Sequence, residues 1–313
     1  MSDSFSAAIR VVTPMMLLML IGVVLRKRSY ITRPAMKQYD KLIFILFMPV
    51  LMFKNIYDMD FSQGFAVKEM AFAGVCLLSI FAFSLTFPKL LTKDGNKSSV
   101  IGQAVVRGNY ILFGVAVSEA LYGEGNIGAV IMLSVLVIPT INIFSAVILE
   151  LNRSGQAKFG KLCLAILKNP MIVGAILAFV FKFFALRIPA PVWSVVRNIA
   201  NSTTTISFLS LGVGLDMAEA LSDKRLLLWG VFLRMIVVPL IFMPLSVLMG
   251  FRGASLCAMM IVFAAPSAVA SYPMAVAMGA DGQLAGQLVC VTTVLSVFTI
   301  FLWTFGLHSL GFM

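Results

Sequence analysis

Apolar stretches that are long enough to cross a lipid bilayer recur along the whole of this chain. A helix rises about 1.5 Å per residue, so one span needs roughly 20 mostly apolar residues. Ten stretches meet this requirement, near residues 7–25, 38–56, 69–91, 100–122, 127–149, 162–184, 191–215, 226–249, 254–278 and 284–307. Because a helix satisfies its own backbone hydrogen bonds in hydrocarbon, the pattern predicts an all-α polytopic membrane protein with ten transmembrane helices.

The composition agrees with a protein embedded in a lipid bilayer. Of the 313 residues, 60% are hydrophobic and 12% are charged, which is more apolar surface than a soluble fold can bury. The net charge of +11 would suggest a nucleic-acid partner in a soluble chain, but here it indicates basic cytoplasmic loops. The four cysteines lie far apart, in neither a metal-ligand spacing nor a disulfide framework. We therefore expect no nucleic acid, no metal and no cofactor.

The distribution of basic residues predicts the orientation of the spans. With the N-terminus outside, the connections after spans 1, 3, 5 and 7 face the cytoplasm and hold 15 of the 24 lysines and arginines, against six on the outer side. Since basic loops stay on the cytoplasmic side, both termini are expected on the outer side of the cell inner (plasma) membrane.

The chain divides into two halves of equal span number. The longest hydrophilic connection, residues 150–161, separates residues 1–152 from residues 153–313, with five spans in each half. A unit with an odd number of spans inserts with opposite orientation when it is duplicated, which predicts an inverted repeat. Thr13-Pro-Met-Met resembles Asn169-Pro-Met-Ile, and other short matches recur at nearly the same spacing of about 156 residues.

Two spans are badly suited to an uninterrupted helix. Residues 103–114 carry the charge of Arg107 and the amide of Asn109 beside glycines, and residues 264–274 contain two prolines, the first being Pro266. A charge or an unwound backbone in hydrocarbon is costly unless protein or water satisfies it. At the repeat spacing, Asn109 falls opposite Pro266. Glycine and proline are common in single kinked membrane helices, but two matched interruptions are typical of a secondary transporter's binding site.

Short motifs in a fixed order extend over nearly the whole chain. They are Phe47-Met-Pro-Val-Leu-Met-Phe-Lys-Asn-Ile56, Arg107-Gly-Asn109, Lys168-Asn-Pro-Met-Ile-Val-Gly174, Leu211-Gly-Val-Gly-Leu215, Arg234-Met-Ile-Val-Val-Pro239, Ala265-Pro-Ser267, Gly279-Ala-Asp281 and Thr292-Thr-Val-Leu-Ser296. Their order and spacing resemble the auxin efflux carrier family in its compact prokaryotic form. Plant carriers have a long cytoplasmic loop between the halves, whereas the short connection here resembles that of bacterial members assigned to malate, malonate or similar anions.

This resemblance implies two inverted five-helix repeats, with a scaffold domain and a transport domain that each draw helices from both repeats. It also implies that the broken helices of spans 4 and 9 cross near the middle of the membrane, that a substrate carboxylate binds at this crossing, and that the protein is a homodimer through its scaffold. The expected function is a secondary transporter that moves a small organic anion, such as malate, malonate or an auxin-like acid, by alternating access. An uncoupled anion channel or uniporter and a sodium-coupled bile-acid-type symporter are the alternatives.

Arg107 is the first candidate for substrate binding. It lies about nine residues, or roughly 13 Å, inside the cytoplasmic end of span 4. Its guanidinium group can hold a carboxylate through two hydrogen bonds. Alternatively, the side chain reaches back to the lipid headgroups or pairs with a fixed acid such as Asp40. Nearby, Asn109 either binds substrate or caps a helix end.

Further candidates for substrate binding are polar or helix-breaking residues in or near the spans. They are Gln103, Pro266, Ser267, Ser271, Asn55 and Asn142. Pro266 is expected to shape the crossing, while Ser267 and Ser271 stand at the start of a half-helix whose positive end favours an anion. The polar residues within 198–205 of span 7 either line a cavity or join helices by hydrogen bonds.

Asp40, at the inner end of span 2, is the candidate for coupling to a proton or cation. Its alternative role is an interface charge beside Lys37 and Lys41. The spans carry no pair of acids, no nucleophile with a base and no histidine cluster, so we expect no catalytic residue and no enzyme activity.

Overall fold

The computed structural model describes residues 2–58, 67–123, 125–154, 164, 167–215 and 223–313. Within these ranges the regular structure is helical, and the only strand-like contact is one isolated bridge between residues 108 and 267. The predicted all-α class is therefore confirmed.

Each described helix falls within or next to one of the stretches that the sequence predicts to be helical. The first half contains α1 (Ser2–Lys27), α2 (Arg33–Leu42), η1 (Ile43–Phe47), α3 (Met48–Tyr57), α4 (Val67–Leu91), α5 (Gly95–Val106), α6 (Tyr110–Tyr122) and α7 (Gly128–Ser154). The second half contains α9 (Pro170–Phe183), α10 (Ala190–Gly214), α11 (Lys224–Phe232), η3 (Leu233–Val237), α12 (Val238–Leu248), α13 (Gly253–Ala264), α14 (Ser271–Ala277) and α15 (Gly282–Ser309).

Several of these helices are long and apolar enough to cross a membrane. In the part of the chain that the structure describes, four segments meet this condition: Val67–Leu91, Gly128–Leu151, Lys224–Leu248 and Gly282–Ser309. Spans 4 and 9 do not appear among them because each is broken into two shorter helices. The chain has the architecture of a polytopic membrane protein.

Prolines and capping residues explain where the helices change course. The π-helical turns η1 and η3 directly precede Met48-Pro49 and Val238-Pro239. A proline has no N–H group and its ring clashes with the carbonyl four residues earlier, so the backbone widens there by one residue. Asp94 caps α5 by accepting hydrogen bonds from the N–H groups of Asn96 and Lys97.

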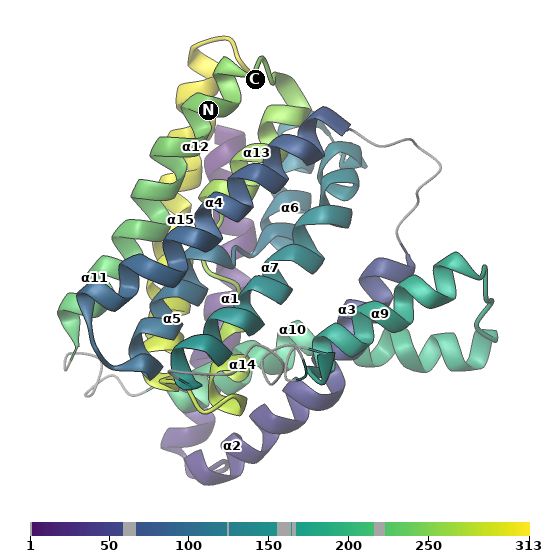
Figure 1. The fold of residues 1–313 in the computed structure, drawn as a ribbon, viewed down its shortest axis with the longest axis vertical. Helices are drawn as coiled ribbons and strands as arrows, with labels where there is room; N and C mark the ends of the chain where they lie inside the picture. Colours follow the sequence, from purple (N-terminus) through teal and green to yellow (C-terminus); the bar gives the residue numbers. More distant parts are fainter. Residues whose placement is uncertain (1, 59–66, 124, 155–163, 165–166, 216–222) are drawn as a thin grey trace.

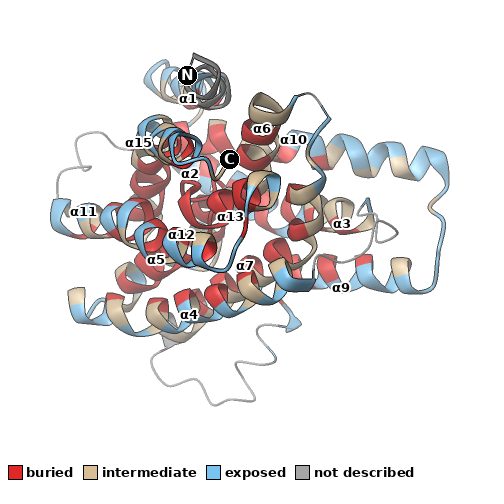
Figure 2. Cartoon of the chain, turned by 90° about the horizontal axis from the view of Figure 1, so that it is seen from above, coloured by how far each residue is buried: buried red, intermediate tan, exposed pale blue. Residues whose placement is uncertain are grey.

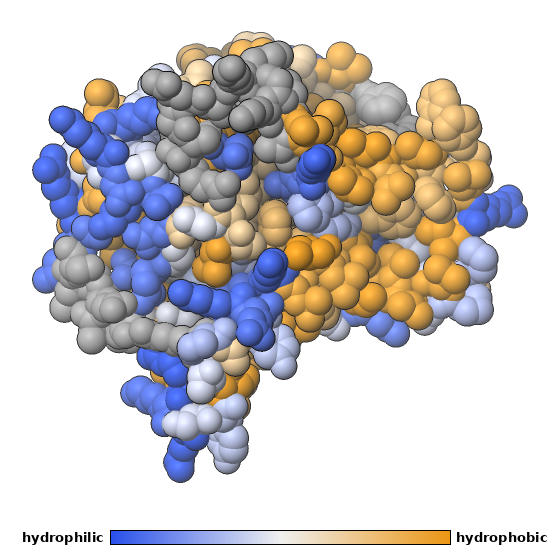
Figure 3. Space-filling model, turned by 60° about the horizontal axis from the view of Figure 1, so that its bottom comes forward, coloured by the Kyte–Doolittle hydropathy of each residue, from blue (hydrophilic) through white to orange (hydrophobic). Residues whose placement is uncertain are grey.

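The helices form a central bundle with a projecting arm (Figure 1). Helices α4–α7 and α11–α15 surround the core, whereas α3, α9 and the first part of α10 project to one side. Burial follows this arrangement, because α5 and α13 are the most enclosed helices, whereas the outer part of the arm, in α9 and the first part of α10, carries many exposed residues (Figure 2). Hydrophobic residues also gather on the side of the arm, whereas hydrophilic residues surround α2 (Figure 3).

Helices α1 and α10 bring their backbones into direct contact at two glycines. A Cβ atom on Gly212 of α10 would lie 2.1 Å from the Met19 carbonyl oxygen of α1, and one on Gly22 would lie 2.3 Å from the Leu209 carbonyl oxygen. Helices α3 and α9 meet in the same way, since a Cβ atom on Gly174 would lie 2.5 Å from the carbonyl oxygen of Pro49. Small residues permit this packing between membrane helices.

Candidate functional site

The two interrupted spans meet at their breaks in the centre of the bundle. Between α5 and α6, the Asn109 N–H group donates a hydrogen bond to the Pro266 carbonyl at 2.8 Å. In return, the Ala268 N–H group donates to the Arg107 carbonyl at 2.9 Å. These two bonds form an antiparallel bridge between Gly108 and Ser267. The expected pairing of the two interruptions is therefore present, and we call this region the crossing.

Arg107 points into the protein at the crossing, with 3% of its surface exposed. Its guanidinium group donates to the Asn142 side-chain oxygen at 2.6 Å and to the Ala270 carbonyl at 3.2 Å. It also faces two sulfur atoms, of Met274 at 3.0 Å and of Met171 at 3.9 Å. The described residues place no carboxylate within ion-pair distance of it. Arg107 thus neither reaches the headgroups nor pairs with Asp40.

Buried polar atoms of three side chains near the breaks have no hydrogen-bond partner in the described structure. The atoms without a partner are both polar atoms of Gln103, the side-chain nitrogen of Asn109 and the hydroxyl of Ser271. Gln103 is fully buried in α5, four residues before Arg107. Asn109 stands at the N-terminus of α6 but its side chain makes no capping bond. Because buried polar groups are normally satisfied, these unpaired atoms single out the crossing as the candidate site for a polar ligand.

The other predicted site residues mostly build the crossing. The Ser267 hydroxyl donates to the Ala104 carbonyl at 3.2 Å, and its N–H group donates to the Thr292 hydroxyl at 3.1 Å. The half-helix α14 begins at Ser271 and has seven residues, so the expectation that Ser267 also stands at its start is wrong. Ser267 lies in the non-helical segment between α13 and α14, where the ring of Pro266 prevents the helix from continuing. Asn55 is partly buried on α3, and no described hydrogen bond joins it to the crossing.

Arg234 is the residue of the crossing to which sequence reasoning assigned no role. Its guanidinium group is 1% exposed and donates to the carbonyls of Ala265 at 2.8 Å, Val105 at 2.9 Å and Val262 at 3.2 Å. These carbonyls belong to the ends of α5 and α13. One sequence signal could have indicated that Arg234 binds within the protein. It is an arginine inside a predicted span, and no acidic residue lies three or four positions away to pair with it.

Asp40 is fully buried between α2, α10 and α14. The Ser210 hydroxyl donates a hydrogen bond to its carboxyl group, and the Tyr272 hydroxyl lies beside the same group. The alternative role as an interface charge is therefore wrong. Tyr272 has room there because Gly214 carries no side chain, since a Cβ atom would lie 1.8 Å from the Tyr272 hydroxyl oxygen.

Comparison with known proteins identifies the group to which the chain belongs. The sequence model of the family described as "Membrane transport protein" matches residues 7–304. The chain belongs to the membrane transport protein family. The resemblance to the auxin efflux carriers is thereby confirmed. Similarity to "Uncharacterized transporter MJ1031" of Methanocaldococcus jannaschii agrees, at 21% identity over 309 residues that cover 94% of this chain and 96% of that protein.

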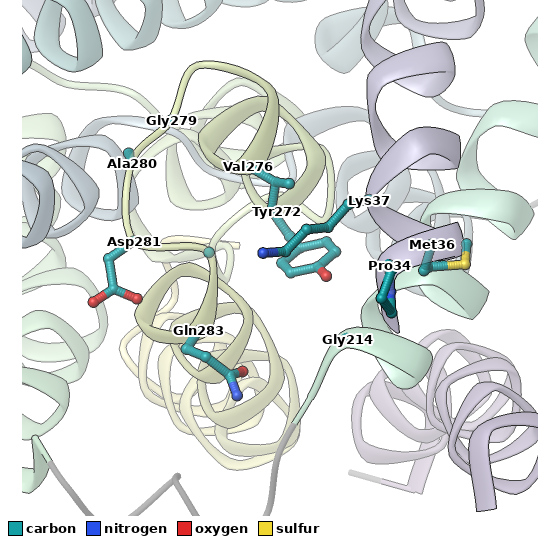
Figure 4. A pocket seen from close by; sticks show the side chains of 11 residues that line it. Pro34, Met36, Lys37, Gly214, Tyr272, Val276, Gly279, Ala280, Asp281 and Gln283 are labelled. Carbon is teal, nitrogen blue, oxygen red and sulfur yellow. The ribbon is translucent and has the colours of Figure 1, made fainter. Parts of the chain in front are cut away.

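The membrane transport protein has a cavity of about 620 Å³ beside Asp40. Lys37 of α2 and Tyr272 of α14 line it, and Asp281 and Gln283 line it at the start of α15 (Figure 4). Tyr272 lines the cavity, and its hydroxyl lies beside the carboxyl group of Asp40. The cavity therefore opens between α2 and the α14–α15 turn, two segments that come from different halves of the chain.

The polar cluster of α10 in this transporter serves only in part to join helices. The Thr203 hydroxyl donates to the Phe47 carbonyl at 3.2 Å and so connects α10 to the end of η1. In contrast, Asn198, Asn201 and Ser202 are exposed on the surface of the single chain.

Proposed function

We propose that this protein is a secondary transporter that carries a small organic anion, a carboxylate such as malate, malonate or an auxin-like acid, across the cell inner (plasma) membrane by alternating access. The observation that carries the proposal is the buried guanidinium group of Arg107, which has no carboxylate partner in the described residues. It is accompanied by the unpartnered polar groups of Gln103, Asn109 and Ser271.

The contacts of Arg107 favour an anion as its missing partner. Sulfur is a weak hydrogen-bond acceptor, so the N–H groups that face Met274 and Met171 are poorly satisfied. A buried cation is costly without a counter-charge. A carboxylate would replace the two sulfur contacts by charge-assisted hydrogen bonds, and the amide groups of Gln103 and Asn109 would bind the rest of a polar substrate.

Substrate titration and counterflow test this function. Thermal unfolding of the purified protein against mono- and dicarboxylates should reveal at least one ligand that raises Tm. Counterflow in proteoliposomes should then distinguish the carrier from an uncoupled channel, and replacing sodium by choline should leave uptake unchanged. If no carboxylate stabilises the protein, the proposal is wrong. Uptake without counterflow would favour the channel, and loss of uptake in choline would favour the sodium-coupled symporter.

We further propose that residues 1–152 and 153–313 form two inverted five-helix repeats with ten spans. Reciprocal packing supports this, because α1 packs on α10 while α9 packs on α3. The break between α5 and α6 also matches the break between α13 and α14 in its place within each half. In this arrangement α1–α3 with α9–α10 are the scaffold, and the remaining helices are the transport domain.

Cysteine labelling from outside the cell tests the orientation of the spans. In a cysteine-free background, His308→Cys should react with an impermeant reagent in intact cells, because the C-terminus is expected outside. Asn96→Cys should react only after the membrane is opened. Both side chains are exposed in the structure, so poor access would not explain a negative result. The opposite labelling pattern would show that the termini lie in the cytoplasm.

We propose Asp40 as the residue that couples transport to a proton or cation. Asp40→Asn keeps the shape and an oxygen that accepts from Ser210, so the fold should persist. Because the proposed site at Arg107 does not include Asp40, transport should fall without being abolished, and substrate affinity should stay unchanged. Lys41→Ala, at an exposed neighbour, is the matched control. Complete loss of transport in a folded variant that binds substrate would mean that Asp40 is indispensable to the transport cycle itself, and not only to its coupling.

We also propose that the transporter is a homodimer through its scaffold. Asn198, Asn201 and Ser202 are exposed on a helix predicted to span the membrane, where hydrocarbon would solvate them poorly. A second copy of the chain would cover them. Ser202→Cys should therefore form a disulfide-linked dimer in native membranes under mild oxidation, and recovery of monomers alone would argue against this interface.

A further inference from the structure

Arg234 occupies the point where two half-helices end. Its Nη1 atom donates to Val105 near the end of α5, while Nη2 and Nε donate to Val262 and Ala265 at the end of α13. All three acceptors are backbone carbonyls, and no carboxylate of the described residues pairs with the guanidinium group.

The ends of these half-helices form an electronegative site. The last carbonyls of a helix have no partner within the helix, and its C-terminus carries roughly half a negative charge. Three such carbonyls that converge from two helices have the chemistry of a site for a monovalent cation. In transporters with interrupted helices, helix C-termini and unwound carbonyls coordinate the coupling ion. In this protein the guanidinium group of Arg234 supplies the positive charge at these carbonyls.

Two local features allow the guanidinium group of Arg234 to reach these carbonyls. Gly108 leaves room for it, because a Cβ atom there would lie 2.1 Å from Nη2 of Arg234. The widened turn η3, which precedes Pro239, carries Arg234 itself. Each of the three nitrogen atoms of Arg234 thus donates to a backbone carbonyl, in contrast to Arg107 with its sulfur contacts.

We propose that Arg234 is a built-in cation that fills the ion site of the crossing. It is a positioning residue, because it holds the ends of α5 and α13 together and thereby places the backbone of Arg107 and Asn109. Two consequences follow. The native crossing has no vacancy for sodium at these carbonyls, and a variant without the guanidinium group should gain a site for a small monovalent cation such as free guanidinium.

Chemical rescue of Arg234→Ala tests this inference. The Tm of the purified variant should fall by roughly 10 °C, because several charge-assisted hydrogen bonds are lost together. Low-millimolar guanidinium should restore at least half of the loss. Urea, which is neutral and of similar shape, should restore none. Met235→Ala is the matched control, since it empties a buried position in the same turn without removing charge, and guanidinium should not raise its Tm.

If Arg234→Ala does not fold, a comparison of two more conservative variants tests the same inference. Arg234→Lys retains the charge and should lose less Tm than Arg234→Gln, which retains only polarity. Guanidinium should raise the Tm of the second variant and not that of the first. Equal losses in both, or no rescue beyond that of Met235→Ala, would overturn the inference. The readout is stability without substrate, so the proposed carboxylate transport can fail or hold independently.

Discussion

Arg107→Ala is expected to weaken carboxylate binding by about ten- to a hundredfold. The reason is that a hydrogen bond to a charged group contributes roughly 1.5–3 kcal/mol, and the guanidinium group has only neutral partners in the described structure. Arg107→Lys keeps the charge but loses the planar fork, so its affinity should lie between those of the wild type and the alanine variant. The measurement is substrate titration of purified, folded protein.

Two controls separate binding from folding in this series. Arg197→Ala removes an exposed arginine from α10 and should leave the affinity unchanged. Asn109→Ala should weaken binding by about fivefold, which corresponds to roughly 1 kcal/mol for a neutral hydrogen bond. Its stability should change little, because the Asn109 side chain does not cap α6. Wild-type affinity in folded Arg107→Ala would mean that the arginine has a purely structural role.

Gly212→Ala is expected to lower Tm by about 2–5 °C, since overpacking costs roughly 1–3 kcal/mol and the unfolding entropy of a chain of this length converts 1 kcal/mol into about 1.5 °C. The added methyl group would lie 2.1 Å from the Met19 carbonyl oxygen, which is backbone and cannot rotate away. Helices α1 and α10 would have to separate, and the hydrogen bonds from Arg26 to the carbonyls at the end of α10 would lengthen.

Gly306→Ala provides the matched control for this prediction. It also lies in a helix predicted to span the membrane, but a Cβ atom added there would have no atom of a neighbouring helix within 4 Å. Because alanine favours helix over glycine, its Tm should stay the same or rise slightly. Equal losses in the two variants would show that the close contact between α1 and α10 is not what makes Gly212 necessary.

The sequence by itself determined the helical elements and their interruptions. Runs of apolar residues set where helices can lie in a bilayer, and this pattern is local. The breaks at Arg107 to Asn109 and at Pro266 are local as well, because proline and glycine act on their own turn of helix. The repeat spacing then paired Asn109 with Pro266, and the structure joins these two residues by a backbone hydrogen bond.

Only the tertiary structure decided what each polar side chain does. Arg107 and Arg234 look alike in sequence, but one faces sulfur atoms and the other binds three carbonyls. Arg234 and Val105 are 129 residues apart, and no local pattern brings them together. The sequence left Asp40 open between a coupling residue and an interface charge beside lysines, and helix packing buries it against Ser210. The physical reason is that charge and polarity are local properties, whereas burial and hydrogen-bond partners depend on which distant backbones meet.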